Sequence, residues 1–356
     1  MARTVDNSFT KLDENLNLDP FVRQKAQTLH NTIRDDLTRA GLIAGSFLQG
    51  SFARKTMLKP LKDVDIVCLL PAYMWETLRG PEGPGKAMES FEAPIVERWP
   101  HVQFDVGDEP AGKALRLTLS GVDFNIDLVP AFDGEGDHVL IGDRFEGTWT
   151  PSNTRIQLKK VSERNQATDG RFVHQVREAK QLTKHHDELE FVSGIVVESL
   201  AYAVIGRKTS DKDAIAALLE HAKTAVLGPV IEPAGDDDVT AKWTSDERAT
   251  AARVYAQASR KAAEALALEG AGDMDAAIDV WHSLFGDAFP AAPARSVESA
   301  LTALAAGSVT STGRPTTTRA AHQVAAPGRS WTRGSAGRAG AERATVFGDP
   351  GAWFSR

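Results

Sequence analysis

Short runs of alternating or β-branched apolar residues dominate the first 150 residues of the chain and predict β-strands. Five runs have this character: GSFLQ (45–49), DVDIVCLL (63–70), HVQFDV (101–106), KALRLTLS (113–120) and VDFNIDLV (122–129). The last two meet at Gly121-Val122, so we expect them to pair as an antiparallel hairpin. The first part of the chain is therefore expected to contain a mixed or antiparallel sheet.

Two helices are predicted among these strands. One occupies residues 18–40, where Asp19 suits the N-cap, Pro20 suits the first turn, and Gly41 is a stop signal. The other runs from about residue 85 to residue 99. Both lie between predicted strands or before them, so they are expected to cover the sheet.

After Pro151 the pattern becomes that of helices. Helical stretches are predicted at 152–166, 171–186, 191–206, about 211–227 and about 241–268. The fold class is therefore α/β (α+β), with a sheet and helices first and a mainly helical part second. We predict a domain boundary at residue 150, with the first domain in 1–150 and the helical domain in 151–306.

From about Gly307 the composition shifts to Gly, Ala, Ser, Thr, Pro and Arg. This segment has seven Arg and no Lys against Glu342 and Asp349, so it carries a charge of about +5 and leaves about −12 on residues 1–306. So little apolar content does not offset the entropy of ordering. Residues 307–356 are therefore predicted to be a disordered tail that is dispensable for chemistry. If the tail has a use, we expect its aromatic end to bind a regulatory or conjugating partner.

Composition narrows the classes of function. The formal charge of −7 argues against a constitutive duplex-DNA binder, because phosphate contacts need a basic surface. The single cysteine, Cys68, excludes an intramolecular disulfide. The first residues lack an apolar signal core, and the longest apolar run, 191–206, is short and contains Glu198. We therefore expect a cytoplasmic protein that does not associate with membranes.

The segment QGSFARKTMLKPLKDVDIV (49–67) places a Gly-Ser turn directly after the first predicted strand. Glycine allows a close backbone approach, and the exposed N–H groups of such a turn bind phosphate oxygens. A Gly-Ser pair on its own is usually only a loop. In this context Gln49, Gly50 and Ser51 become candidate nucleotide-binding residues.

Three aspartates are candidate metal ligands and catalytic residues. Asp63 and Asp65 are two positions apart in a strand, so they share one face while Val64 points to the other. Asp127 supplies a third carboxylate from a later apolar strand. Each alone is compatible with turn chemistry or an edge charge, but carboxylates on one face repel each other unless a cation lies between them. Hard oxygen ligands suit Mg²⁺ or Mn²⁺, and three carboxylates can hold two ions for in-line phosphoryl displacement.

Gly-Ser, then Asp-x-Asp about a dozen residues on, then one Asp on a later strand, resembles the polymerase-β-like nucleotidyltransferases. Within them, QGSFARKTMLKPLKDVDIV and FNIDLVPAF are most similar to the bacterial CD-NTases, the cGAS/DncV-like cyclases of CBASS anti-phage defence. The resemblance implies metal binding by Asp63, Asp65 and Asp127 and a triphosphate contact from Ser51. It also implies a nucleotidyltransferase core packed on a helical domain, with the active site between them.

Two further residues follow from the same resemblance. VREAKQLTKHH resembles the family helix whose lysine reaches the donor triphosphate, which implies this role for Lys180. FVSGIVVESLAY resembles the next helix, whose early serine approaches the phosphates, here Ser193. From the residues alone, the favoured interpretation is a solvated surface lysine for Lys180 and a helix cap for Ser193. The family's Trp or Tyr soon after the lysine is absent here, where the sequence has KHHD.

The expected reaction uses ATP or another nucleoside triphosphate with two Mg²⁺ ions, Mn²⁺ being a possible substitute. Repeated transfer to a second nucleotide and ring closure would give a cyclic di- or trinucleotide, and the resemblance implies that a separate effector protein reads it. Two alternatives stay open. One is adenylylation of a protein, an RNA end or a small molecule, and the other is an inactive nucleotide-binding scaffold.

Overall fold

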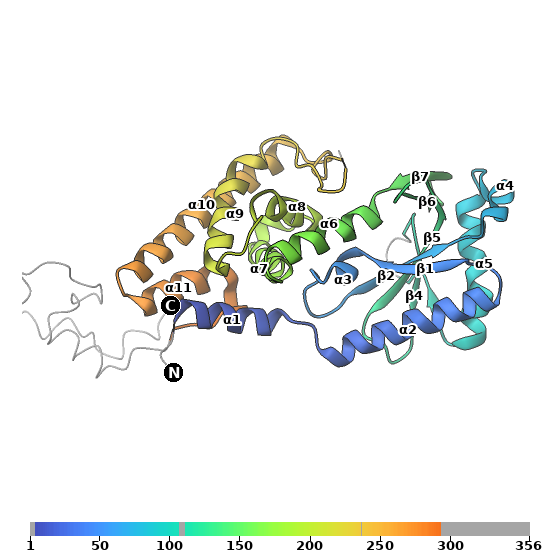
Figure 1. The fold of residues 1–356 in the computed structure, drawn as a ribbon, viewed down its shortest axis with the longest axis horizontal. Helices are drawn as coiled ribbons and strands as arrows, with labels where there is room; N and C mark the ends of the chain where they lie inside the picture. The colour runs from blue at the N-terminus through green and yellow to red at the C-terminus, as the bar shows by residue number, and fades with distance from the viewer. Residues whose placement is uncertain (1–3, 107–110, 236, 293–356) are drawn as a thin grey trace, which may run out of the picture. The chain divides into compact units, whose positions relative to one another are not determined.

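In a computed structural model of the chain, which describes residues 4–106, 111–235 and 237–292, seven strands form one mixed sheet (Figure 1). The strands are β1 (Gly45–Gln49), β2 (Asp63–Leu69), β3 (Gln103–Phe104), β4 (Leu115–Thr118), β5 (Asn125–Asp133), β6 (Val139–Asp143) and β7 (Thr148–Ser152). Their order is β1-β2-β5-β4-β3, and β6 joins β5 to β7. Only β2 and β5 pair in parallel, and the other pairs are antiparallel.

All five predicted strands are present, although β3 is reduced to two residues. The predicted hairpin is confirmed, because β4 and β5 pair antiparallel with Leu117 opposite Ile126. The last two strands, β6 and β7, were not predicted. Strand β7 includes Pro151 and pairs on one side only, with β6. Proline is compatible with an edge strand, but it weakens the sequence pattern of one.

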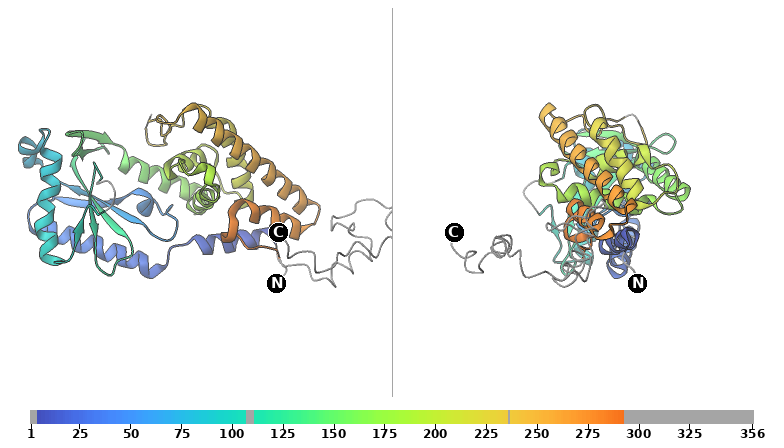
Figure 2. Two further views of the ribbon diagram at one scale, coloured as in Figure 1. Left: turned by 180° about the vertical axis from the view of Figure 1, so that it is seen from behind. Right: turned by 90° about the vertical axis from the view of Figure 1, so that its left-hand side faces the viewer.

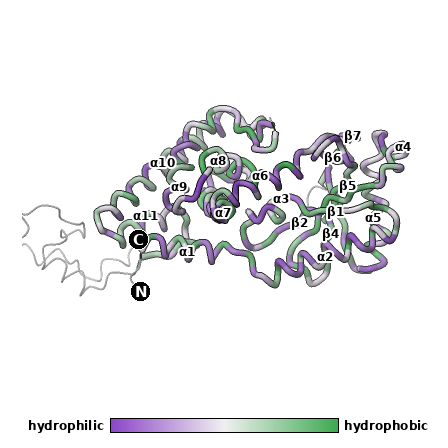
Figure 3. The backbone as a smooth tube through the Cα atoms, viewed as in Figure 1, coloured by the Kyte–Doolittle hydropathy of each residue, from purple (hydrophilic) through white to green (hydrophobic). Residues whose placement is uncertain are grey.

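Two long helices cover one face of this sheet. They are α2 (Pro20–Arg39) and α5 (Gly83–Arg98), and the short helices α3 (Gly50–Arg54) and α4 (Trp75–Leu78) lie in the connections. The predicted N-cap of α2 is confirmed, since the Asp19 side chain accepts a hydrogen bond from the Phe21 N–H. Along α2 and α10 (Ser245–Gly270) the colour alternates between hydrophilic and hydrophobic in Figure 3, which is typical of helices that cover a core on one side.

The alternation of β2 decides which side chains reach these helices. Val64, Ile66 and Cys68 are buried in the core with α2 and α5, whereas Val67 packs on the opposite face of the sheet, with Val129 of β5. Successive strand residues point to opposite faces. The odd-numbered positions of β2, which include both of its aspartates, therefore face away from α2 and α5.

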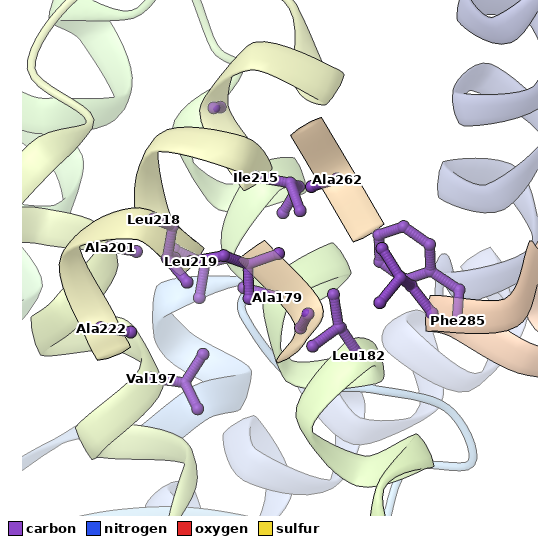
Figure 4. Close-up of a cluster of buried hydrophobic side chains, with 14 of the residues drawn as sticks. Ala179, Leu182, Val197, Ala201, Ile215, Leu218, Leu219, Ala222, Ala262 and Phe285 are labelled. Carbon is purple, nitrogen blue, oxygen red and sulfur yellow. The ribbon is translucent and has the colours of Figure 1, made fainter. Parts of the chain in front are cut away.

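The second half of the described chain is helical, as predicted. It contains α6 (Thr154–Ala167), α7 (Phe172–His185), α8 (Gly194–Val204), α9 (Asp211–Ala225) and α10, with short 3₁₀ turns at Asp187–Leu189 and Gly286–Ala288. It also contains α11 (Met274–Phe285), which was not predicted. A further 3₁₀ turn, Ala72–Met74, follows β2 in the first half. Side chains from α7 to α11 form a second apolar core, part of which is shown in Figure 4. None of the described helices has the length and apolarity needed to cross a membrane.

Helix α1 (Val5–Leu16), which was not predicted, belongs to this second core although it precedes the sheet in sequence. Figures 1 and 2 show it beside the helices rather than against the sheet, in agreement with its contacts to α7, α9 and α11. Phe9 is the centre of the contact, with ring centroids 5.0 Å from Trp281, 5.7 Å from Phe285 and 5.1 Å from Phe289. The predicted boundary at residue 150 stays a prediction, and the predicted tail, 307–356, lies outside the described residues.

Replacing Phe9 tests the contribution of α1 to stability. Phe9 is 1% exposed and is surrounded by three aromatic rings, so Phe9→Ala should lower the free energy of unfolding by about 3–5 kcal/mol. The matched control is Phe21→Ala, since Phe21 is 86% exposed and should change stability by less than about 0.5 kcal/mol. Urea denaturation of both variants measures the difference. Equal stabilities would contradict the role of α1 as part of the core.

Candidate active site

The parallel pair of β2 and β5 brings the three predicted aspartates together. In its register Asp65 lies opposite Asp127, and Asp63 lies opposite Asn125. All three carboxylates come from positions on the face that α2 and α5 leave uncovered, because the buried apolar residues of both strands occupy the alternate positions. The face shared by Asp63 and Asp65, inferred from their spacing, is therefore the face that also carries Asp127.

The pKa values of two of these carboxyl groups reflect their closeness. Burial, followed by the negative charge of Asp127, raises the pKa of Asp63. Burial, followed by the charges of Asp63 and Asp127, raises the pKa of Asp65 to about 6. Like charges at short range disfavour the ionised form. The cluster therefore has a surplus of negative charge that a positively charged group would stabilise.

One such group is Arg116, which the sequence analysis did not identify. Its Nε donates to Asp127 Oδ1 over 2.9 Å, and its Nη2 donates to Asp127 Oδ2 over 2.8 Å. This bidentate contact follows from the register of β4 and β5, in which Arg116 lies directly opposite Asp127. The hairpin connection sets the register of β4 and β5, so the sequence could have predicted this pair. That prediction would have required the position of the turn to within one residue.

The three aspartates suit a hard divalent cation in their chemistry, since they supply carboxylate oxygens from neighbouring strands. Their present arrangement is not that of a closed metal site. In the part of the chain that the structure describes, no set of three or more His, Cys, Asp or Glu side chains is placed to hold a metal ion. At Asp127, both carboxylate oxygens accept hydrogen bonds from Arg116. A cation at this carboxylate would share it with Arg116 or displace the guanidinium.

Gly50 allows the Gly-Ser turn to approach these carboxylates. Its φ of 70° lies in the left-handed region, and a Cβ at this position would lie 2.0 Å from Asp65 Oδ2. No side chain fits there without displacing the carboxylate. The preceding residue, Gln49, ends β1 opposite Asp65. The close contact of this turn with Asp65 therefore accounts for the glycine of the motif.

A cavity of about 740 Å³ opens beside this cluster. Of the predicted residues, Ser51, Asp63 and Lys180 line it. The wall also contains Lys59, Lys62, Lys184, His186, Asp187 and Glu190, together with apolar side chains from the 56–61 segment and from α8. These lysines were not predicted as site residues. Lys59 and Lys62 belong to the segment between the Gly-Ser turn and Asp63. The high density of lysine in this segment was the sequence feature that could have predicted them.

The two helical residues predicted from the resemblance have different positions. Lys180 has only 10% of its side chain exposed, and its Nζ donates to Thr56 O, Thr56 Oγ1 and Glu198 Oε2 over 3.1, 3.2 and 3.3 Å. Ser193 is the N-cap residue of α8, is exposed, and makes no capping hydrogen bond with its side chain. The next residue, Gly194, does line the cavity, and a Cβ there would lie 3.3 Å from Lys180 Cε.

Two comparisons with known sequences show what this chain is similar to. Residues 3–165 match the family described as SMODS, the Second Messenger Oligonucleotide or Dinucleotide Synthetase domain. A probable cyclic nucleotide synthase of Bacillus cereus (strain VD146) is 22% identical over 276 residues, which cover 68% of this chain and 81% of that protein.

Solved structures of similar fold include three bacterial proteins. CdnC of Escherichia coli MS115-1 in complex with HORMA-deltaN has a TM-score of 0.65 at 14% identity, covering 80% of this chain and 98% of that one. CdnG of Bradyrhizobium diazoefficiens in complex with GTP, described as a CD-NTase, has a TM-score of 0.60 at 15% identity, covering 80% and 96%. DncV of Vibrio cholerae in its apo form has a TM-score of 0.60 at 12% identity, covering 81% and 97%.

The polymerase-β-like fold predicted from the sequence is confirmed by these likenesses. The matched family domain spans the Gly-Ser turn and all three aspartates of the site. Residues 3–165 therefore match a family of second-messenger nucleotide synthetase domains, and the described chain shares its fold with solved CD-NTases.

Proposed function

We propose that this nucleotidyltransferase joins nucleoside triphosphates into a cyclic di- or trinucleotide that acts as a second messenger in CBASS anti-phage signalling in the cytoplasm. The observation that carries the proposal is that Asp63, one of the three coupled carboxylates, stands in the wall of a cavity that four lysines also line. Binding of a triphosphate needs positive charge along its phosphates. Nucleotidyl transfer also needs carboxylates that hold cations near the reacting phosphate. The cavity offers both within one wall.

The protein's own groups would bind and orient the donor nucleotide. Lys59, Lys62, Lys180 and Lys184 line the cavity, and ammonium groups bind phosphate oxygens through charge-assisted hydrogen bonds. Ser51 lies in the same wall and offers a hydroxyl donor to a phosphate oxygen. Held in this way, the α-phosphate would face Asp63 and the neighbouring carboxylates, which is the orientation that nucleotidyl transfer requires.

Asp63, Asp65 and Asp127 would hold Mg²⁺ ions, for which Mn²⁺ is a substitute. When bound, the cations lower the pKa of the attacking ribose hydroxyl and stabilise negative charge at the α-phosphate. Arg116 balances the charge of Asp127 in the structure, so its guanidinium would move or share the carboxylate. Asp127 is the group we assign to orienting the acceptor hydroxyl and assisting its deprotonation.

The substrates and partners of relatives support this assignment. Escherichia coli CdnC has been solved with ATP and, separately, with a HORMA protein, and Bradyrhizobium CdnG with GTP. We propose nucleoside triphosphates, with ATP among them, as substrates of the present chain, and a separate effector protein as the reader of its product.

The product distinguishes this function from its alternatives. The protein is incubated with the four nucleoside triphosphates and Mg²⁺, and the products are analysed by mass spectrometry. We expect a small cyclic nucleotide whose mass equals the sum of its nucleotidyl units without terminal groups. A labelled protein, RNA end or small molecule would instead indicate adenylylation. No turnover under any nucleotide and metal combination would indicate a nucleotide-binding scaffold and contradict the proposal.

Removing two of the coupled carboxylates tests the chemistry. Asp63→Asn with Asp65→Asn should reduce turnover at least about a thousandfold, because the charges that hold the cations are lost. In EDTA the thermal midpoint should stay equal or rise, since the repulsion between the carboxylates is also removed. The matched control is Glu89→Gln with Glu97→Gln on α5, where both carboxylates are exposed; it should turn over like wild type. Retained activity in the aspartate variant would rule out this site.

Neutralising a cavity lysine tests the triphosphate site. Lys180→Met should raise the KM for the nucleotide about tenfold with a smaller change in kcat, because a contact present in the ground state contributes mostly to binding. Ser51→Ala should act in the same direction and more weakly. Lys242→Met is the control, since Lys242 is exposed and does not line the cavity. Steady-state pyrophosphate release measures all three, and an unchanged KM in Lys180→Met would contradict its assignment.

A further inference from the structure

Glu198 on α8 is a buried carboxylate with three side-chain donors, and no sequence motif singled it out as a site residue. Only 2% of its side chain is exposed. Its Oε1 accepts from Arg54 Nε over 2.5 Å, and its Oε2 accepts from Thr56 Oγ1 over 2.8 Å and from Lys180 Nζ over 3.3 Å. Both oxygens of this carboxylate are therefore satisfied by groups from two distant parts of the chain.

These donors connect the two hydrophobic cores. Arg54 and Thr56 directly follow the Gly-Ser turn, and their neighbour Phe52 is buried in the core of the sheet. Lys180 and Glu198 lie on α7 and α8, which belong to the helical core. One carboxylate thus ties the segment that follows the turn to the helices that form the opposite wall of the cavity.

Stability alone is a weak explanation for such a cluster. The cost of removing ions from water largely offsets their attraction in a buried pair, so a buried ion pair contributes little net stability compared with apolar residues of similar size. The location of the cluster is more informative. Thr56 and Lys180 both line the cavity beside Asp63, so a change in either alters the wall that faces the triphosphate.

The charge of Lys180 depends on this neighbour. Burial lowers the pKa of Lys180, and the charge of Glu198 opposes that effect, while the charge of Arg54 adds to it. Burial disfavours the charge of Glu198 as well, but Lys180 and Arg54 together outweigh it and lower the pKa of this carboxyl. The three N–H donors of the ammonium match three protein acceptors, Thr56 O, Thr56 Oγ1 and Glu198 Oε2. Contacts with Glu198 and Thr56 therefore set the position of the Lys180 ammonium, and the charges of Glu198 and Arg54 influence its protonation.

We propose that Glu198 is a positioning residue for the nucleotide: it holds Lys180 and the segment after the Gly-Ser turn in the geometry that binds the triphosphate. The inference rests on the proposed function of the cavity. Glu198 does not touch the substrate in this scheme, and it acts through Lys180 and Thr56. With one carboxylate between two buried cations, the cluster keeps a net positive charge at the cavity wall.

The first test is Glu198→Gln, which keeps the size of the side chain and removes its charge. Its KM for the nucleotide that wild type turns over fastest should rise about tenfold, with kcat changed by less than about threefold. Isothermal titration with ATP, in Mg²⁺ and in EDTA, should show a matching loss of affinity without requiring turnover. Thr56→Val removes two of the contacts without altering the charge and should act in the same direction, more weakly.

The pH profile separates positioning from a purely structural role. Triphosphate binding uses the charged form of Lys180, so KM rises as pH passes above its pKa. Burial and the charge of Arg54 both lower the pKa of Lys180, and the charge of Glu198 raises it. Removing the charge of Glu198 therefore lowers the pKa of Lys180 further. The rise in KM should therefore move to lower pH in Glu198→Gln. The other titratable groups of the cavity wall stay in place in the variant: Lys59, Lys62, Asp63, Lys184, His186, Asp187 and Glu190.

A double variant tests whether Glu198 acts through Lys180. Residues that share one interaction are non-additive, so Glu198→Gln with Lys180→Met should have a KM close to that of Lys180→Met alone. The matched control is Glu178→Gln on α7. Glu178 is fully buried, with no hydrogen-bond partner for either oxygen among the described residues, and faces the charges of Asp211 and Arg171 rather than the cavity. It should bind nucleotide like wild type.

The outcomes are distinct. If wild type makes no product and binds no ATP, the proposed function fails. If wild type is active but folded Glu198→Gln, checked by circular dichroism and thermal unfolding, keeps its KM, ATP affinity and pH profile, the inference about Glu198 is wrong. If Glu198→Gln does not fold, an unchanged KM and ATP affinity in Thr56→Val would overturn the inference in its place. Fully additive effects of Glu198→Gln and Lys180→Met would also overturn it.

Discussion

The parallel pairing of β2 and β5 is the constraint on which the site depends. It sets Asp65 beside Asp127 across one ladder, at the centre of a sheet whose other pairs are antiparallel. A shift of one residue in this register would turn the aspartates toward the apolar core beneath α2 and α5. The buried residues between them, such as Val64 and Ile66, oppose that shift because they would lose their places in the core. The hydrophobic core thus specifies the position of the most polar part of the protein.

That arrangement concentrates negative charge, and three features of the surrounding structure adjoin it. Arg116 is fixed opposite Asp127 by the neighbouring ladder. Gly50 brings a backbone turn against Asp65 where no side chain fits. The cavity beside Asp63 is lined by lysines. Under the proposed function, a cation at Asp127 would share that carboxylate with Arg116 or displace the guanidinium, and the cavity lysines would contact the phosphates.

The helical half contributes more than a support for the sheet. Helix α1 crosses from the start of the chain into the helical core, where Phe9 packs among three aromatic rings. The cluster around Glu198 makes a second connection, this time at the cavity wall. Both connections join segments far apart in the chain.

Local periodicity was sufficient for much of the fold. The alternation in DVDIVCLL and VDFNIDLV, the Asp19-Pro20 start of α2 and the helical patterns after Pro151 each depend on residues adjacent in the chain, and each was predicted correctly. Strand β7 was missed, because its Pro151 resembles a strand breaker unless its edge position is known. The shared parity of Asp63 and Asp65 was likewise a local property.

The rest required the tertiary structure. The contact of Arg116 with Asp127 depends on the register of a ladder, and that of Glu198 with Arg54 joins residues 144 positions apart. No periodicity encodes such a pair, because it follows from how whole elements pack. The motif indicated the candidate carboxylates, since metal-assisted chemistry restricts which residue types can serve there. The groups that hold and balance them were decided by packing, since many residue types would satisfy the local pattern and only the folded chain selects their partners.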